Sequence, residues 1–206
     1  MENDVKEFLS ELLKQLKSID YIKPEDIPNI DLYMDQVTTF MDEQLEACKR
    51  YEDDKILTKT MINNYAKNNL LPSPDKKKYS KEHVLTLLFI YYFKNILSIN
   101  DIRSILNPLT EKYFGNDDGF TMQDVYTEVF SLEAEESQKL LKDLGKKYKI
   151  AGETFEDFPA EDQKFLHTFS FICMLSFDVY IKKMLIERMI DDLNEENEAS
   201  KIGGKN

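Results

Sequence analysis

The sequence has little of what a metal centre, a disulfide scaffold or a nucleophilic enzyme needs. Its 206 residues include two cysteines, two histidines and no tryptophan. Cys48 and Cys173 are too far apart for a metal-ligand spacing, and one pair of cysteines makes no disulfide framework. His83 and His167 lie in different segments. We therefore expect no metal, no cofactor and no covalent chemistry, so the chain is predicted not to be an enzyme.

Glycine and proline are also scarce, at six residues each, which argues against a strand-rich fold with many turns. Leucine, isoleucine, lysine and glutamate are abundant, so an all-α fold is expected. The longest nearly apolar run, residues 84–93, has about half the length of a membrane span. The acidic start "MENDVKEF" is unlike a signal or transit peptide. We expect a cytoplasmic protein that does not enter the membrane.

Apolar residues at three- and four-residue spacing predict helices along most of the chain. The expected helices cover 3–19, 31–50, 58–69, 81–96, 98–107, 122–149 (one or two helices) and 161–194. The expected connectors cover 22–30, 51–55, 110–120 and 151–162, and the tail 194–206 is expected to be frayed. The residues expected in the core of these helices include Leu32, Val37, Phe40, Met41, Leu45, Ile99, Ile102, Ile105, Leu106, Val125, Val129, Leu140, Leu141 and Leu144.

The third helix has clear ends in the sequence. Thr58 or Thr60 is expected to cap its start, and Pro72 and Pro74 forbid its continuation. The following "DKKKY" (75–79) predicts a turn and a short strand. The third helix is therefore expected to be followed by an extended basic hairpin.

The next two helices carry capping signals as well. Ser80 is expected to cap the helix 81–96, which is so apolar that it should form the buried centre of the fold. His83, early in that helix, is expected to make a structural hydrogen bond. "SIND" (98–101) has the spacing of a capping box, and Pro108 is expected to end the helix that it starts.

The segment around the third helix differs in charge from the rest of the chain. The whole sequence has a net charge of −12. From Lys55 to His83 there are seven lysines and two acidic residues, a net charge of +5, so the remainder carries −17. A compact basic patch can bind phosphates while the acidic remainder suppresses indiscriminate binding. The alternative is that "KKK" (76–78) is an ordinary solvated run of charges.

The helical wheel of residues 57–67 separates two faces. The apolar face holds Leu57, Met61, Ile62, Tyr65 and Ala66. The opposite face holds Lys59, Thr60, Asn63, Asn64 and Lys67. This polar face lacks carboxylates, although the chain has 39 of them. Amides can bond bidentately to adenine in the major groove, and lysines suit phosphate or guanine, so the composition favours DNA recognition over solvation.

The order of elements resembles the winged helix-turn-helix of the MerR regulators. The residues that carry the resemblance are Tyr65, Leu70, Leu71, Pro72, Tyr79, Ser80 and the helix 99–106. Four segments are similar in sequence to an uncharacterised bacterial family, domain of unknown function 1836. They are "LYMDQV" (32–37), "LTKTMINNY" (57–65), "KKKYSKEH" (76–83) and "YYFKNILSI" (91–99). The resemblance covers about residues 28–112.

The resemblance implies a double-stranded DNA partner. Lys59, Thr60, Asn63, Asn64 and Lys67 would then face the major groove, and Lys76, Lys77 and Lys78 would straddle the backbone as a wing. Tyr79 would either reach a phosphate with its hydroxyl or pack under the wing. MerR proteins present arginine where Asn63 and Asn64 stand, and their turn between the helices is shorter than the one around 51–55.

The predicted division of the chain has four parts. These are an N-terminal helix and connector (1–27), a MerR-like winged helix-turn-helix (28–112), a C-terminal helical bundle (113–194) and a flexible tail (195–206). In the bundle, the aromatic residues Phe165, Phe169, Phe177 and Tyr180 either line a pocket for a small hydrophobic effector or form plain core. Its last helix is expected to supply a homodimer interface through Ile181, Met184, Leu185, Met189 and Leu193, without a strict heptad.

Three functions are consistent with these features. The first is a DNA-binding transcriptional regulator without catalytic activity. The second is a protein-interaction module whose basic winged-helix face holds an acidic partner. The third, an enzyme acting on a small molecule in the C-terminal region, has no nucleophile–base arrangement behind it.

Overall fold

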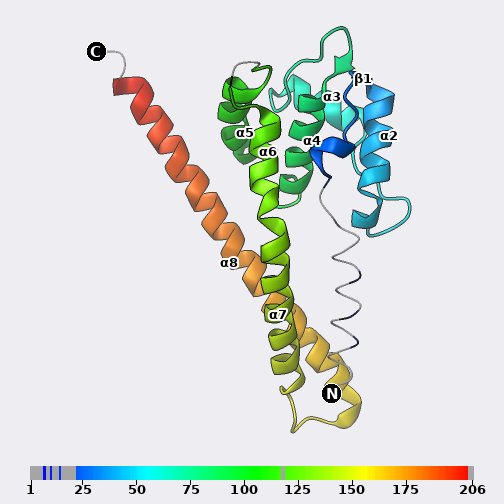
Figure 1. Ribbon diagram of the computed structural model, residues 1–206. Helices are drawn as coiled ribbons and strands as arrows, with labels where there is room; N and C mark the ends of the chain where they lie inside the picture. Colours follow the sequence, from blue (N-terminus) through cyan, green and yellow to red (C-terminus); the bar gives the residue numbers. More distant parts are fainter. Residues whose placement is uncertain (1–6, 8–9, 11–13, 15–21, 117–118, 204–206) are drawn as a thin grey trace. The chain divides into compact units, whose positions relative to one another are not determined.

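The computed structural model describes residues 7, 10, 14, 22–116 and 119–203. The expected helix 3–19 therefore lies almost wholly outside the described residues. The described chain is mostly helical, which confirms the all-α expectation, with one small two-stranded sheet (Figure 1). Residues 132–185 form one compact unit, here called unit 1, and residues 22–131 together with 186–203 form another, unit 2.

Unit 2 contains most of the elements. In chain order they are η1 (Pro24–Asp26), β1 (Leu32–Tyr33), α2 (Met34–Gln44), η2 (Glu46–Cys48), α3 (Lys59–Lys67), β2 (Lys78–Tyr79), α4 (Lys81–Phe93), α5 (Ile99–Tyr113) and α6 (Met122–Ser131). The last part of α8 (Ala160–Gly203) also belongs to this unit, and its Ile190 joins the core.

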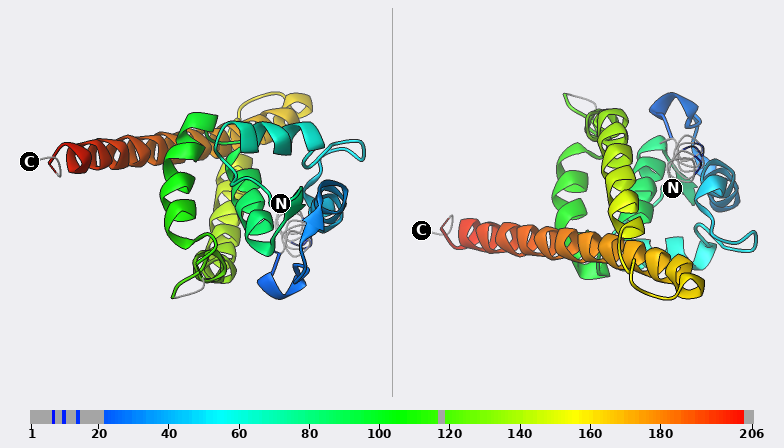
Figure 2. Two further views of the ribbon diagram at one scale, coloured as in Figure 1. Left: turned by 90° about the horizontal axis from the view of Figure 1, so that it is seen from above. Right: turned by 90° about the horizontal axis from the view of Figure 1, so that it is seen from below.

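Helix α4 is the centre of unit 2, as its composition predicts. Every residue from His83 to Tyr91 is buried, because a helix that is apolar all round must be enclosed on all sides. Figure 2 shows α4 in the middle of the unit, with α2 and α5 on opposite sides. The predicted cap is also present, since Ser80 occupies the N-cap and Glu82 lies in the first turn. Glu82 accepts the backbone N–H of Gly115 at 2.6 Å.

Helix α5 begins as predicted and ends later than predicted. The Ser98 hydroxyl accepts the N–H of Asp101 at 3.2 Å, and the Asp101 carboxylate accepts the N–H of Ser98 at 3.1 Å. Pro108 does not end the helix, which continues to Tyr113. A proline inside a helix costs about 3 kcal/mol, and the packing of Leu109 and Tyr113 on the core offsets that cost.

Residues 32–33 are extended instead of helical. Leu32 pairs with Tyr79 and Tyr33 with Lys78 in an antiparallel register. The predicted helix 31–50 is therefore shorter, from Met34 to Gln44. The residues predicted to face inward on this helix are nevertheless buried or half-buried. On α5 the predicted inward residues are also buried or half-buried, except Ile99, which is 50 % exposed.

Helix α6 presents a different face to the core than the one predicted. Met122 and Tyr126 are fully buried, and the Tyr126 hydroxyl donates to the carbonyl of Ile22 at 2.8 Å. Val125 is half-buried, whereas the predicted core residue Val129 is exposed. Tyr126 instead joins the helix to the segment before η1.

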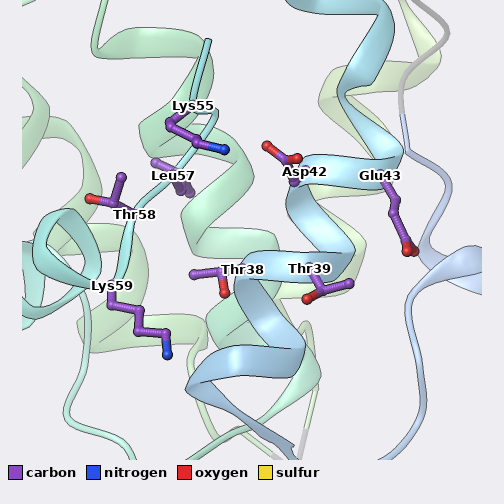
Figure 3. A pocket seen from close by; sticks show the side chains of 8 residues that line it. All are labelled: Thr38, Thr39, Asp42, Glu43, Lys55, Leu57, Thr58 and Lys59. Atoms are coloured by element: carbon purple, nitrogen blue, oxygen red, sulfur yellow. The ribbon is translucent and has the colours of Figure 1, made fainter. Parts of the chain in front are cut away.

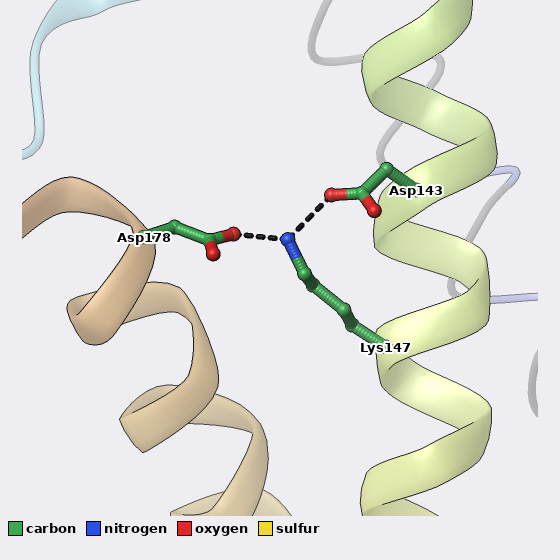
Figure 4. A network of polar contacts seen from close by, with 3 residues as sticks. All are labelled: Asp143, Lys147 and Asp178. Carbon is green, nitrogen blue, oxygen red and sulfur yellow. Dashed lines mark hydrogen bonds and ion pairs between the residues drawn. The ribbon is translucent and has the colours of Figure 1, made fainter. Parts of the chain in front are cut away.

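Unit 1 is built from α7 (Glu133–Gly152) and the first part of α8. Lys147 on α7 forms ion pairs with Asp143 on the same helix and with Asp178 on α8 (Figure 4). Both carboxylates raise the pKa of Lys147. Phe171 of α8 packs edge-on against Tyr148 of α7, with ring centroids 5.4 Å apart. A charged clamp and an aromatic contact therefore hold the two helices together.

The structure corrects two expectations for unit 1 and the tail. Leu140 is exposed, and Leu141 and Leu144 are half-buried, so α7 buries less than predicted. Helix α8 runs on to Gly203, so the expected frayed tail is helical up to that residue. None of the helices in the described ranges has both the length and the apolar character that crossing a membrane requires.

Candidate nucleic-acid interface

Helix α3 starts at the cap that the sequence predicts. Thr58 is the N-cap, and its hydroxyl accepts the backbone N–H of Met61 at 3.2 Å. Thr60, the other predicted cap, lies inside the helix. The segment before the cap is held to the core, because the Lys94 ammonium donates to the Ile56 carbonyl at 2.7 Å. The start of α3 is therefore fixed at both the cap and the preceding loop.

The end of α3 is also fixed. Asn69 has a left-handed backbone with φ of 57°. The N–H of Asn69 bonds to the carbonyl of Ala66 at 3.2 Å, and the N–H of Leu70 to that of Tyr65 at 2.9 Å. This pair of bonds is the Schellman motif, in which asparagine tolerates the left-handed position and the next apolar residue packs back on the helix. Arg103 of α5 also donates to the Asn68 carbonyl at 3.0 Å.

The two predicted faces of α3 are present. Ile62 and Tyr65 are buried, and burial raises the pKa of the Tyr65 phenol. The residues of the opposite face are all exposed, namely Lys59, Thr60, Asn63, Asn64 and Lys67. We call this set the α3 polar face. Because both ends of α3 are anchored, these side chains stand on a rigid helix.

The three lysines of "KKK" (76–78) lie at a tight turn that leads into the short strand β2, which confirms the predicted turn and strand. Lys76 and Lys77 have φ of 47° and 66°, and the N–H of Lys78 bonds to the carbonyl of Asp75 at 2.8 Å. Positive φ at both central residues is the geometry of a type I′ turn, which usually takes asparagine and glycine. Lysine there costs about 1 kcal/mol or more per residue. We call residues 75–78 the basic turn, and its backbone conformation is unfavourable for the two lysines that occupy its centre.

The α3 polar face and the basic turn meet at the same short segment. Lys78 of the turn lies over the ring of Tyr33, with its nitrogen 5.5 Å from the ring centroid. Lys59 of α3 forms an ion pair with Asp35, two residues further on. One cation of each set therefore borders residues 33–35, and Figure 1 shows β1 and α3 at the same end of unit 2.

Tyr33 and Asp35 belong to this surface and were missed by sequence reasoning. Tyr33 is 55 % exposed between the two basic elements. The strand pairing of Tyr33 with Lys78 was the missing information, because the predicted helix placed residue 33 elsewhere. Asp35 brings a carboxylate beside the α3 polar face, although that face itself lacks one. Both partners of the Lys59–Asp35 pair are exposed, so the pair is weak and leaves Lys59 accessible.

Tyr79 packs under the turn and does not join the exposed surface. It is 3 % exposed, and burial raises the pKa of its phenol. Its ring meets His83 edge-on with centroids 5.5 Å apart. The structure therefore favours the packing alternative for Tyr79 over a phosphate contact.

His83 has the structural role that was expected. Its Nδ1 accepts the backbone N–H of Ser80 at 3.0 Å, which ties α4 to the end of β2. Burial lowers the pKa of His83, against a smaller opposing effect of nearby backbone carbonyls and of Asp31. The neutral ring is thus the form that supports the basic turn.

A polar groove of about 450 Å³ lies beside the start of α3 (Figure 3). It is lined by Thr38, Thr39, Asp42, Glu43, Lys55, Leu57, Thr58 and Lys59. Asp42 is engaged by Lys49 at 2.9 Å, and that hydrogen bond is the main cause of its lowered pKa. Charges of both signs line the groove, so it does not have the character of a hydrophobic effector pocket.

The predicted effector pocket on α8 is not formed. Phe165, Phe169, Phe177 and Tyr180 are exposed by 70, 51, 64 and 60 %. The alternative interpretation as plain core is equally wrong for these four residues. They are surface side chains because α8 turns a different face, including Phe171, toward α7. The part of the chain that the structure describes also groups no three His, Cys, Asp or Glu side chains for a metal ion.

The comparisons with known proteins identify a family for unit 2. A family described as a domain of unknown function (DUF1836) matches residues 22–129. The match covers more than half of the chain, so the chain belongs to this family. It extends beyond the 28–112 of the sequence resemblance and includes nearly all of α6. Comparison with curated proteins and with solved structures gave no match.

Proposed function

We propose that the protein is a DNA-binding transcriptional regulator without catalytic activity, using a MerR-like winged helix-turn-helix. In this proposal α3 enters the major groove and the basic turn lies against the phosphate backbone as the wing. The observation that carries the proposal is that Lys59 and Lys78 border the same segment, Tyr33 to Asp35. A duplex offers base edges and phosphates side by side, so a protein that binds it needs one element for the bases and another for the phosphates. Two cationic elements on one surface meet this need.

The roles within this surface follow from chemistry. Asn63 and Asn64 are exposed amides on a rigid helix, and an amide can accept from and donate to adenine at once. Lys76 and Lys77 stand at the tip of the turn, where their charge reaches outward. Holding two lysines in left-handed backbone is a local cost that supports a role for their position.

Substitution of Asn63 by alanine tests the recognition part of the proposal. Selection of bound sequences from a randomised duplex pool should return a defined motif for the wild type. Asn63→Ala should relax the preference at one adenine position with a modest loss of non-specific affinity. Gln123→Ala, an exposed amide on α6, is the matched control and should leave the motif intact. An unchanged motif for Asn63→Ala would remove this residue from direct base recognition.

A second candidate function is a protein-interaction module that holds an acidic partner on the same face. It rests on the same exposed lysines, because lysine attracts the carboxylates of a protein as it attracts phosphates. Retention on heparin followed by anisotropy with mixed duplex DNA separates the two functions. Failure to bind duplex at low salt would favour the acidic protein partner.

A further inference from the structure

Helix α8 carries an exposed stripe with coiled-coil spacing. The stripe consists of Phe165, Phe169, Ile172, Ser176 and Val179, here called the α8 seam. The successive spacings of four and three residues average 3.5, which is the repeat that keeps one helix face against another helix. Residues 181–193 show no strict heptad, and the repeat lies before them. All five seam residues are exposed.

The surface around the seam is uncharged. Between residues 165 and 181 the sequence has one Asp, Glu, Lys or Arg, which is Asp178. Asp178 is engaged by Lys147 on the α7 side. In a chain with 32 % charged residues, an exposed helix face of this length without charge is unusual for a solvated surface.

The exposed area has the size of a protein interface. The four apolar seam residues and the neighbouring Phe177 and Tyr180 each leave more than half of their surface exposed. With about 200 Å² for an aromatic side chain, they expose on the order of 700 Å² together. The largest apolar patch on a typical monomer is about 300–600 Å², whereas each side of a standard interface buries about 800 Å².

We infer that the α8 seam is the interface at which two copies of this chain pair. A suitable partner must be an uncharged apolar helix with a 3.5-residue repeat, and a second α8 supplies that surface. A two-fold axis uses the same patch on both copies, so the seam can complement itself. Ser176, the small residue of the seam, lets the two helix backbones approach in its middle. The inference does not depend on DNA binding.

Sedimentation of the full-length chain tests the inference. The wild type should have twice the mass of one chain at micromolar concentration. Phe169→Glu combined with Val179→Glu should give a monomer with an unchanged circular dichroism spectrum, because both side chains are exposed. Ile150→Glu is the matched control, since this residue is exposed on α7, outside the seam, and its substitution should leave the dimer intact. A monomeric wild type, or a double variant that stays dimeric, would overturn the inference.

Cys173 offers a second readout that does not rely on weakening the dimer. It is exposed and follows the seam residue Ile172. With Cys48→Ser in place, a spin label on Cys173 should show dipolar broadening from its counterpart in the other copy. Dilution with unlabelled protein should remove the broadening. A spectrum without broadening at a concentration where the protein is dimeric would place the interface elsewhere.

Discussion

Unit 2 and unit 1 use their apolar residues in opposite ways. Unit 2 encloses α4 completely and buries residues from every neighbouring helix. Unit 1 buries few large side chains, among them Phe171, and leaves the α8 seam exposed. The difference teaches that an apolar helix indicates a core only where enough neighbours surround it. In unit 1 the same composition instead provides a surface for another helix.

Two sets of lysines, one in each unit, have different surroundings. In unit 1, Lys147 is tied to two carboxylates, so its charge holds α7 to α8. In unit 2, the lysines of the α3 polar face are exposed, and so are Lys76 and Lys77 of the basic turn. Lys147 therefore has a structural role, whereas the exposed lysines of the basic turn and of the α3 polar face are available for a ligand.

The largest effect expected from this comparison concerns core truncation. Ile62→Ala, at a fully buried position of α3, should lower the free energy of unfolding by about 2–5 kcal/mol. Ile150→Ala, at a half-exposed position of α7, should change it by about 0.5 kcal/mol or less. Chemical denaturation of both variants measures the difference. Similar decreases in the two would contradict the view that unit 1 leaves its apolar residues at the surface.

A smaller effect depends on pH. Burial lowers the pKa of His83 in the folded chain below its ordinary value of 6.5. As the pH falls through about 6.5, the unfolded chain takes up this proton before the folded chain does, so the free energy of unfolding decreases. Above that pH the residue makes no pH-dependent contribution. Thermal unfolding between pH 8 and pH 5 follows the change.

His83→Gln should reduce this pH dependence, because glutamine can accept the N–H of Ser80 without titrating. His167→Gln is the control in unit 1 and should keep the dependence. Its imidazole bonds to the Thr154 carbonyl at 2.8 Å and lies far from the basic turn in sequence. Equal pH profiles for wild type and His83→Gln would show that another group governs the acid response.

The sequence predicts α3 almost completely, because its determinants are local. Thr58 caps the helix, Asn69 ends it, and a period of 3.6 residues separates its faces, so neighbours within a few positions decide the structure. The same holds for the capping box at Ser98. Contacts across the chain could not be predicted in this way. The Lys59–Asp35 pair joins residues 24 positions apart, and it depends on how α2 and α3 pack.

The remaining errors have a shared cause. Sequence alone predicts that Pro108 ends a helix. The free-energy cost of a proline inside the helix is offset by the packing of the residues after it, and this packing is visible only in the tertiary structure. The aromatic residues of α8 are predicted to form a pocket or a core, but their exposure depends on which face α7 covers. For Tyr79 the sequence left two alternatives open, and its burial in the folded chain favours packing under the turn. Local sequence signals predict where the helices and strands lie, whereas the burial of each side chain depends on which other elements pack against it.

The central claim is that the cations of the basic turn contact DNA phosphates. The most direct test is the salt dependence of duplex binding by anisotropy, for the wild type and for Lys76→Ala, Lys77→Ala and Lys78→Ala combined. A matched control removes three exposed lysines of unit 1, Lys142, Lys146 and Lys164. The slope of log affinity against log salt should become shallower by about 0.9 for each phosphate that the turn variant no longer neutralises. It should stay unchanged in the control, and an unchanged slope in the turn variant would contradict the claim.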